Sequence, residues 1–241
     1  FTDRDQNVVC RLSMDGITVI SAYGMTDFFR DALSDARLAR FPGIRGGWDA
    51  HNKQYVLSIN QNSGINDTLA FDEKALGWVS FYDYKPKNII SLNNNYFTTV
   101  GGKIYKHYTL APNTQARGVF YGETKNSSVT FVFNGAPSMV KNFQTINYEG
   151  DSGWRMDSFK TNTDLTLPIT SSVFVTTLEQ MQNSLLINRF KLKEDKYYAD
   201  LANGTPSQNG EVVWGSSSSG VKGFFGEVTM SINNSNVGKK E

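Results

Sequence analysis

The chain has 241 residues, which is enough for one large β domain or two smaller ones with a sizeable hydrophobic core. Its 24 basic and 23 acidic residues nearly cancel, which argues against a nucleic-acid binder that relies on a clustered basic excess. No apolar run approaches the roughly 20 residues that a transmembrane helix needs, and no signal peptide opens the sequence. The aromatic content is high, with 16 Phe, 11 Tyr and 4 Trp, and this composition favours pleated strands joined by many turns.

The first 40 residues read as the end of a β repeat followed by a helix. Asp15-Gly16 separates two β-branched runs and predicts a tight turn, because Gly adopts the positive φ that such a turn demands. Apolar residues then recur at helical spacing, which predicts one short helix over residues 26–40 that ends at Pro42-Gly43. The sequence opens at Phe1 in the middle of a strand pattern, so we expect a fragment or processed product of a longer protein.

Residues 41–112 have a period of two and predict a propeller-blade-like antiparallel sheet. After a hairpin that begins at Trp48, the expected strands are 55–59, 68–71, 78–82, 89–92, 96–100 and 103–107. Short strands at such even spacing, with a turn between each pair, are typical of a propeller blade or a sandwich. Periodicity does not distinguish these two architectures.

The pattern breaks around Ala111-Pro112-Asn113, and we expect residues 113–241 to form a C-terminal β domain with a frayed end. The expected strands are 118–123, 128–133, 142–148, 154–160, the hairpin 185–193 and 196–201, and a closing strand at 223–232. Residues 173–181 are ambiguous between strand and helical turn, and 216–220 read as a flexible loop. The predicted fold class is therefore all-β, mainly antiparallel, with propeller-blade-like or sandwich sheets and one helix.

The sequence contains few candidate reactive groups. Cys10 is the only cysteine, and its apolar neighbours indicate a small buried hydrophobe and a reducing folding compartment. The two histidines, His51 and His107, lack a metal-binding spacing, so we expect solvated or packed side chains. We predict no catalytic, cofactor-binding or metal-binding residue and no cofactor.

Two alternatives depend on carboxylates and tryptophans. Paired carboxylates could serve a glycosidase, and the candidates near aromatic residues are Asp49, Asp72, Glu73, Asp83, Glu149 and Asp157. A polar turn is the favoured interpretation of Asp72-Glu73-Lys74. The four tryptophans could form a sugar-stacking platform if exposed, although burial in the core is favoured: Trp48, Trp78, Trp154 and Trp214.

Several longer sequence segments carry a family resemblance that covers nearly the whole chain. They are residues 1–3, 7–18, 23–31, 46–49, 55–57, 71–82, 92–97, 102–105, 190–198 and 220–225. In this order they resemble virion tail structural proteins of the muzzle or nozzle kind, from tailed bacteriophages and especially from crAss-like and related marine phages. The upstream blades that this resemblance implies are missing here.

The resemblance implies a non-catalytic component of the virion tail, assembled in the cytoplasm of the bacterial host. It would hold an oligomeric ring through contacts with copies of itself and with other tail proteins. A glycan-binding receptor-recognition module of a phage tail is the alternative, and a polysaccharide hydrolase is the least favoured one.

Overall fold

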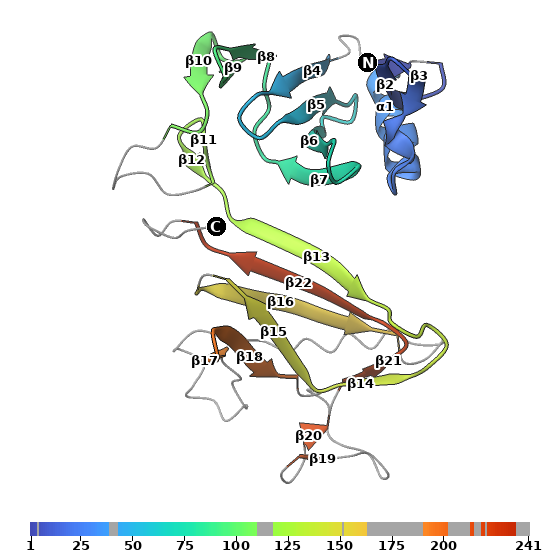
Figure 1. Cartoon of the computed structure of the whole chain (residues 1–241), viewed down its shortest axis with the longest axis vertical. Coiled ribbons are helices and arrows are strands. Elements are labelled where there is room, and N and C mark those ends of the chain that lie inside the picture. Colours follow the sequence, from blue (N-terminus) through green and yellow to red (C-terminus); the bar gives the residue numbers. More distant parts are fainter. Residues whose placement is uncertain are drawn as a thin grey trace. The chain divides into compact units, whose positions relative to one another are not determined.

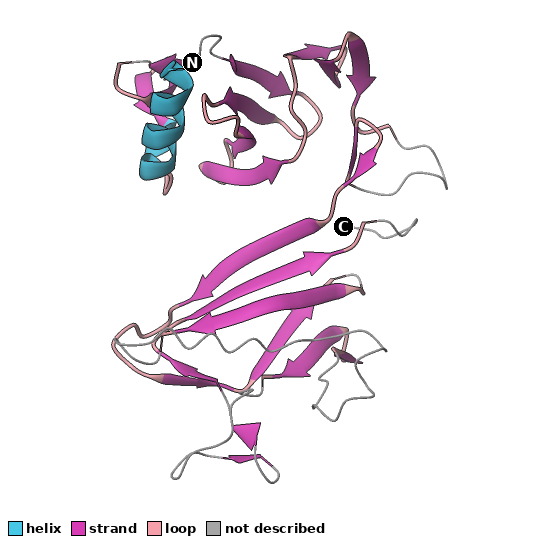
Figure 2. Ribbon diagram, turned by 180° about the vertical axis from the view of Figure 1, so that it is seen from behind, coloured by secondary structure: helices cyan, strands magenta, loops and turns pink. Residues whose placement is uncertain are grey.

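A computed structural model describes residues 1–3, 5–38, 43–109, 118–150, 152–162, 190–201, 213–214, 218–219 and 221–234. The described residues form antiparallel sheets with a single α-helix, which confirms the predicted all-β class (Figures 1 and 2). The chain divides into two compact units. Unit 1 comprises Phe1–Pro112 and Phe120–Glu123, and unit 2 comprises Asn113–Val119 and Thr124–Glu241. The three-part division at residues 40 and 112 stays a prediction.

Unit 1 begins with a three-stranded sheet of order β1-β2-β3, made by Thr2–Asp3, Val8–Ser13 and Gly16–Val19. Gly16 takes a φ of +105°, as the predicted Asp-Gly turn requires. A 3-10 turn, η1 (Ile20–Ala22), follows, and α1 spans Thr26–Leu38. The helix buries one apolar stripe, at Phe29, Ala32, Leu33 and Ala36, because these positions recur every three to four residues.

The centre of unit 1 is a four-stranded meander of order β4-β5-β6-β7. Its strands are Gly43–Asp49, Gln54–Asn60, Asn66–Asp72 and Gly77–Tyr82, and each pairs antiparallel with the next. Leu57, Leu69 and Phe71 lie in one core cluster with the helix residues, whereas Val56 and Ala70 belong to a second cluster. Strand alternation thus buries both faces of the meander. This is the strand order of one propeller blade, and a complete propeller stays a prediction.

A smaller sheet covers the second face of the meander. It has the order β10-β9-β8, with strands Lys103–Lys106, Asn95–Val100 and Asn88–Leu92. Both connections are two-residue turns with positive φ, Asn93-Asn94 (49° and 60°) and Gly101-Gly102 (56° and 76°), which match the right-handed strand twist. Tyr96 from β9 and Tyr84 pack against Val56 and Ala70.

The predicted strand over residues 118–123 is wrong. This segment is a hairpin of β11 (Val119–Phe120) and β12 (Glu123–Thr124). Its turn residues, Tyr121 and Gly122, have φ values of 54° and 88°, which no strand interior adopts.

Unit 2 is built around β22 (Gly226–Ile232), which lies between β13 (Ser127–Phe133) and β16 (Trp154–Thr161). The predicted strand 223–232 is therefore split, because β21 (Val221–Gly223) pairs instead with β14 (Lys141–Phe143). A third sheet has the order β15-β18-β17. The hairpin of β17 (Lys191–Lys193) and β18 (Lys196–Asp200) turns on Glu194-Asp195, as predicted.

The predicted strand 142–148 is also wrong, since it belongs to two sheets. The chain leaves β14 at Gln144, whose carbonyl accepts a hydrogen bond from the backbone N of Leu201 at 2.7 Å, and enters β15 (Thr145–Glu149). The loop predicted at 216–220 is wrong at Ser218–Ser219, which form β20 and pair with β19 (Val213–Trp214). The predictions for residues 173–181, 185–189 and 235–241 lie outside the described residues.

Candidate functional site

A buried carboxylate lies where the β4–β7 meander of unit 1 meets the segment that follows the β10-β9-β8 sheet. Asp49, at the end of β4, is completely buried. Its Oδ2 accepts a hydrogen bond from the Tyr108 hydroxyl at 2.6 Å, and its Oδ1 accepts bonds from the backbone N of His51 (2.9 Å) and of Asn52 (3.3 Å). Because a buried charge is costly unless hydrogen-bonded, these donors explain why this position tolerates an acid.

Two polar side chains complete the shell around Tyr108. The Asn52 side-chain amide donates to the Tyr108 hydroxyl at 2.8 Å. The His51 ring stacks on the Tyr108 ring, with centroids 4.3 Å apart. The β4–β5 turn and the segment after β10 are thereby joined across 59 residues of sequence.

The second histidine lies in the same layer. Thr98 Oγ1 is 2.7 Å from His107 Nε2 and 2.9 Å from the Tyr121 hydroxyl, so one hydroxyl joins β9, the segment after β10 and the β11–β12 turn. The Tyr84 and Tyr96 hydroxyls are 3.0 Å apart, and both rings lie about 5 Å from the His107 ring. We call these five residues, together with Asp49, His51, Asn52 and Tyr108, the interlayer network.

Burial determines the protonation of the interlayer network. It lowers the pKa of His107 to about 4, against a weaker opposing effect of Asp49, so that the ring is neutral at pH 7. Burial also raises the pKa of Tyr84 and of Tyr96, and burial with the Asp49 hydrogen bond raises that of Tyr108. These phenols stay protonated and act as hydrogen-bond donors. The arrangement is suited to fixing two sheets together.

The histidines and carboxylates that the sequence offered as candidates are only partly brought together. His51, His107 and Asp49 meet in the interlayer network, a convergence that their sequence positions did not predict. Among the described residues no group of three or more His, Cys, Asp or Glu side chains could hold a metal ion. Cys10 is buried, and burial is the main cause that raises the pKa of its thiol, in line with the predicted buried hydrophobe.

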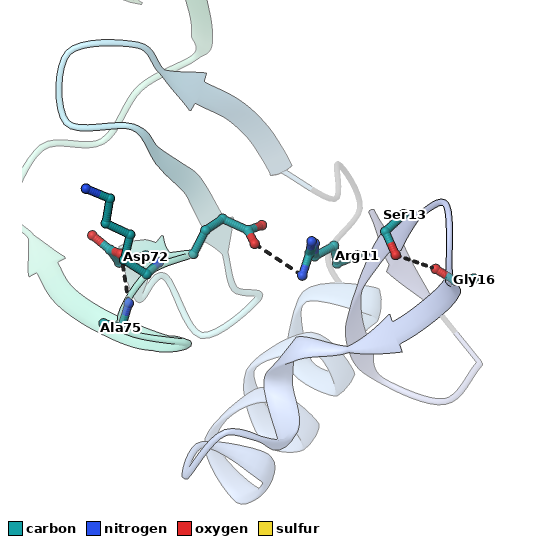
Figure 3. Close-up of polar contacts among 7 residues, drawn as sticks. Arg11, Ser13, Gly16, Asp72 and Ala75 are labelled. Atoms are coloured by element: carbon teal, nitrogen blue, oxygen red, sulfur yellow. Dashed lines mark hydrogen bonds and ion pairs between the residues drawn. The ribbon is translucent and has the colours of Figure 1, made fainter.

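Asp72 organises the turn after β6. Its Oδ1 accepts bonds from the backbone N of Lys74 (2.7 Å) and of Ala75 (3.0 Å; Figure 3), and its Oδ2 accepts one from the Gln54 amide (3.2 Å). These donors lower the pKa of Asp72, that of Ala75 most strongly. The adjacent Glu73 forms an ion pair with Arg11 at 3.2 Å. The geometry is that of the favoured polar turn.

The other carboxylate candidates lie on the surface or in ion pairs. Glu149 in unit 2 is exposed and pairs across the strands with Lys196 at 3.4 Å. Asp157 pairs with Arg155 at 2.6 Å, and Asp83 is exposed. None of these three has the buried, donor-rich surroundings of Asp49.

The tryptophans do not form one platform within a unit. Trp78 packs against Phe29 and donates its indole N–H to the Ile20 carbonyl at 3.0 Å. Trp154 packs against the core of unit 2. Trp48 is 45% exposed on β4, contrary to the favoured burial. The Trp214 side chain lies outside the described residues.

Several strands expose apolar side chains to an extent that is unusual for a monomer. On β13, Val129, Val132 and Phe133 are each at least 44% exposed, and they lie on both faces of the strand. Among the described strands β13 pairs only with β22, so its other edge is unpaired. In unit 1, Leu12, Met14 and Ile17 are exposed on the β2–β3 hairpin. Such strand edges and faces are typical of interaction surfaces.

Two units of antiparallel sheet, a buried network that joins layers, and exposed apolar strands define the class as an all-β protein. Residues 115–203 match the family model of the Crassvirus muzzle protein C-terminal domain. This match confirms the resemblance to muzzle-type tail proteins over less than half of the chain, and it supports a structural role in a phage tail. No curated protein matches the chain. Within the described residues, no helix is long and apolar enough to cross a membrane.

Proposed function

We propose that this chain is a structural component of the muzzle region of a tailed-phage virion. Contacts with other tail proteins and with copies of itself hold it in an oligomeric ring, after assembly in the host cytoplasm. The observation that carries the proposal is the match of residues 115–203 to the muzzle C-terminal domain. The exposed strands of both units offer the surfaces that such contacts need.

The proposed mechanism is mechanical. The meander of unit 1 is covered on both faces, and the interlayer network joins its layers with directional hydrogen bonds. A layered body of this kind keeps its shape while its exposed strands engage neighbours. We also propose that the chain is organised in three segments. Residues 1–40 form the end of a β repeat with a helix, residues 41–112 a blade-like sheet, and residues 113–241 a C-terminal β domain.

Peptide quantification in purified particles tests this function. Particles are banded by density, stripped with high salt and digested, and peptides of this chain are measured against the major capsid protein. A structural component is expected at a fixed copy number per particle that salt does not reduce. A chain that is absent, or that salt removes, would overturn the proposal.

Glycan recognition is the second candidate, and the exposed Trp48 favours it. An exposed indole can stack on a sugar ring. Trp48→Ala should abolish binding to a glycan array, with unchanged thermal unfolding, if this role applies.

We further propose that the chain is non-catalytic. The variants Asp72→Asn and Glu149→Gln should then leave the turnover of a polysaccharide panel at its background level.

A further inference from the structure

The small sheet of unit 1, formed by β8, β9 and β10, has an outward face of its own. Registers across the sheet place Ile90, Phe97 and Lys106 in one row, and Asn88, Thr99 and Ile104 in the next. Leu92 lies on the same face, beside Asn95. The opposite face carries the buried Tyr96 and Thr98, so the sheet has one inner and one outer side.

The outward face is strongly apolar for a solvent-facing surface. Ile90 is 47% exposed, Leu92 61% and Ile104 72%. Figure 1 shows this sheet next to β4, at the end of the meander. An exposed cluster of aliphatic side chains on a flat sheet is a feature of binding surfaces rather than of free ones.

The borders of this sheet are basic and carry no compensating acid. From Tyr84 to Gly122 the sequence contains Lys85, Lys87, Lys103 and Lys106 but no Asp or Glu. In the part of the chain that the structure describes, Lys87, Lys103 and Lys106 form no ion pair, whereas Lys160 and Lys196 do. The three unpaired lysines are exposed: Lys106 lies on the face, Lys103 lies at the start of β10 in the row of Val100, and Lys87 directly precedes β8.

We propose that this face, the β8–β10 face, docks a different protein through a surface in which carboxylates alternate with aliphatic side chains. The aliphatic side chains of the face would be buried by those of the partner, and its lysines would pair with the carboxylates. This inference rests on the proposed function, in which protein contacts hold the chain, and it names the chemistry of one partner.

A different protein fits this face better than a second copy or a nucleic acid. The exposed apolar strands β2, β3, β7 and β13 do not offer a set of carboxylates, because β7 and β13 have no charged residue and the β2–β3 hairpin has a single acid, Asp15. A nucleic-acid site would present clustered cations without four exposed or half-buried apolar side chains among them.

Carbodiimide crosslinking of purified particles tests the inference, because it joins a lysine directly to a carboxylate in contact. We expect Lys103 and Lys106 to crosslink to Asp or Glu of another polypeptide. The ion pairs Lys160–Glu227 and Lys196–Glu149, each 3.4 Å long, serve as internal controls for the chemistry. Control crosslinks without any from the β8–β10 face, or crosslinks from it only to copies of this chain, would overturn the inference and leave the proposed function intact. A chain missing from the particles would overturn both.

Charge reversal then measures how much the lysines contribute to the affinity for the partner. Lys103→Glu/Lys106→Glu should weaken binding of the crosslinked partner by roughly tenfold or more. The matched control, Lys191→Glu/Lys193→Glu on exposed β17, makes the same change of net charge in unit 2 and should leave the affinity within about twofold. Equal losses from both pairs would contradict a specific face.

Discussion

At the scale of single residues, His107 of the interlayer network links the stability of the fold to pH. His107 is neutral in the folded chain because burial lowers its pKa to about 4. An unfolded histidine has a pKa near 6.5, so below about pH 6.5 the unfolded chain binds a proton that the folded chain excludes. The contribution of His107 is therefore fully present above about pH 6.5 and is lost as the pH falls towards 4.

The first prediction concerns this pH dependence. Lowering the pH from 7 to 4.5 should reduce the free energy of unfolding of unit 1 by about 2 kcal/mol through His107, a value reduced because the ring is partly exposed. Urea unfolding of the wild type and of His107→Gln checks it, since the variant should lack this part of the slope. His51→Gln keeps His107 and should keep the slope; equal slopes in all three proteins would contradict the account.

The second prediction concerns the buried carboxylate. Asp49→Ala leaves three hydrogen-bond donors without their acceptor, and it should destabilise unit 1 by about 2–3 kcal/mol. Asp72→Ala also removes an acceptor of three bonds, but near solvent, where water replaces it, and should cost about 1 kcal/mol or less. Chemical unfolding of the two variants shows which one loses more unfolding free energy. A larger loss for Asp72→Ala would contradict the assignment of Asp49 to the interlayer network.

At the scale of elements, the close approach of β4 and β8 depends on a missing side chain. A Cβ at Gly47 would lie 2.6 Å from Ile89 Cβ, which is closer than real contacts. Gly47→Ala should therefore push the two sheets apart and cost about 1–3 kcal/mol. The loss should shrink in an Ile89→Ala background, as a double-mutant cycle of unfolding free energies would show. Gly135→Ala, where a Cβ meets nothing within 4 Å, is the control, and a loss as large as that of Gly47→Ala would contradict the steric cause.

The elements also show where sequence reasoning succeeds. Turns such as Asp15-Gly16, Gly101-Gly102 and Glu194-Asp195 were predictable, because they punctuate runs with a period of two. The helix was predictable because four apolar positions share one face. These signals are local, so a single sequence contains them.

The errors arise where partners lie far apart in sequence. Nothing near Gln144 indicates that the chain changes sheets there, since the change is set by pairing with β18 and β21. The interlayer network was missed for the same reason: Asp49 and Tyr108 are 59 residues apart. The one available signal was that Asp49 follows Trp48 at the start of a turn, where backbone N–H groups can donate to a carboxylate.

At the scale of the whole molecule, the family match ends before the last strand of unit 2. The match stops at residue 203, yet β22, which joins β13 to β16, begins at Gly226. A chain ending at Asn203 should therefore fail to form this sheet. Circular dichroism and proteolysis should show an unfolded unit 2, whereas the full chain resists both. A folded, protease-resistant unit 2 in the truncated chain would show that β22 is dispensable.

The central claim is that this chain is a fixed structural part of a phage tail near its muzzle. Electron cryomicroscopy of purified particles tests it most directly, because the meander of unit 1 and the β13-β22-β16 sheet of unit 2 can be fitted separately into the density. We predict symmetric copies of both units around the tail axis, with exposed strands such as β13 covered by neighbouring chains. Density that accommodates neither unit anywhere in the tail would contradict the account.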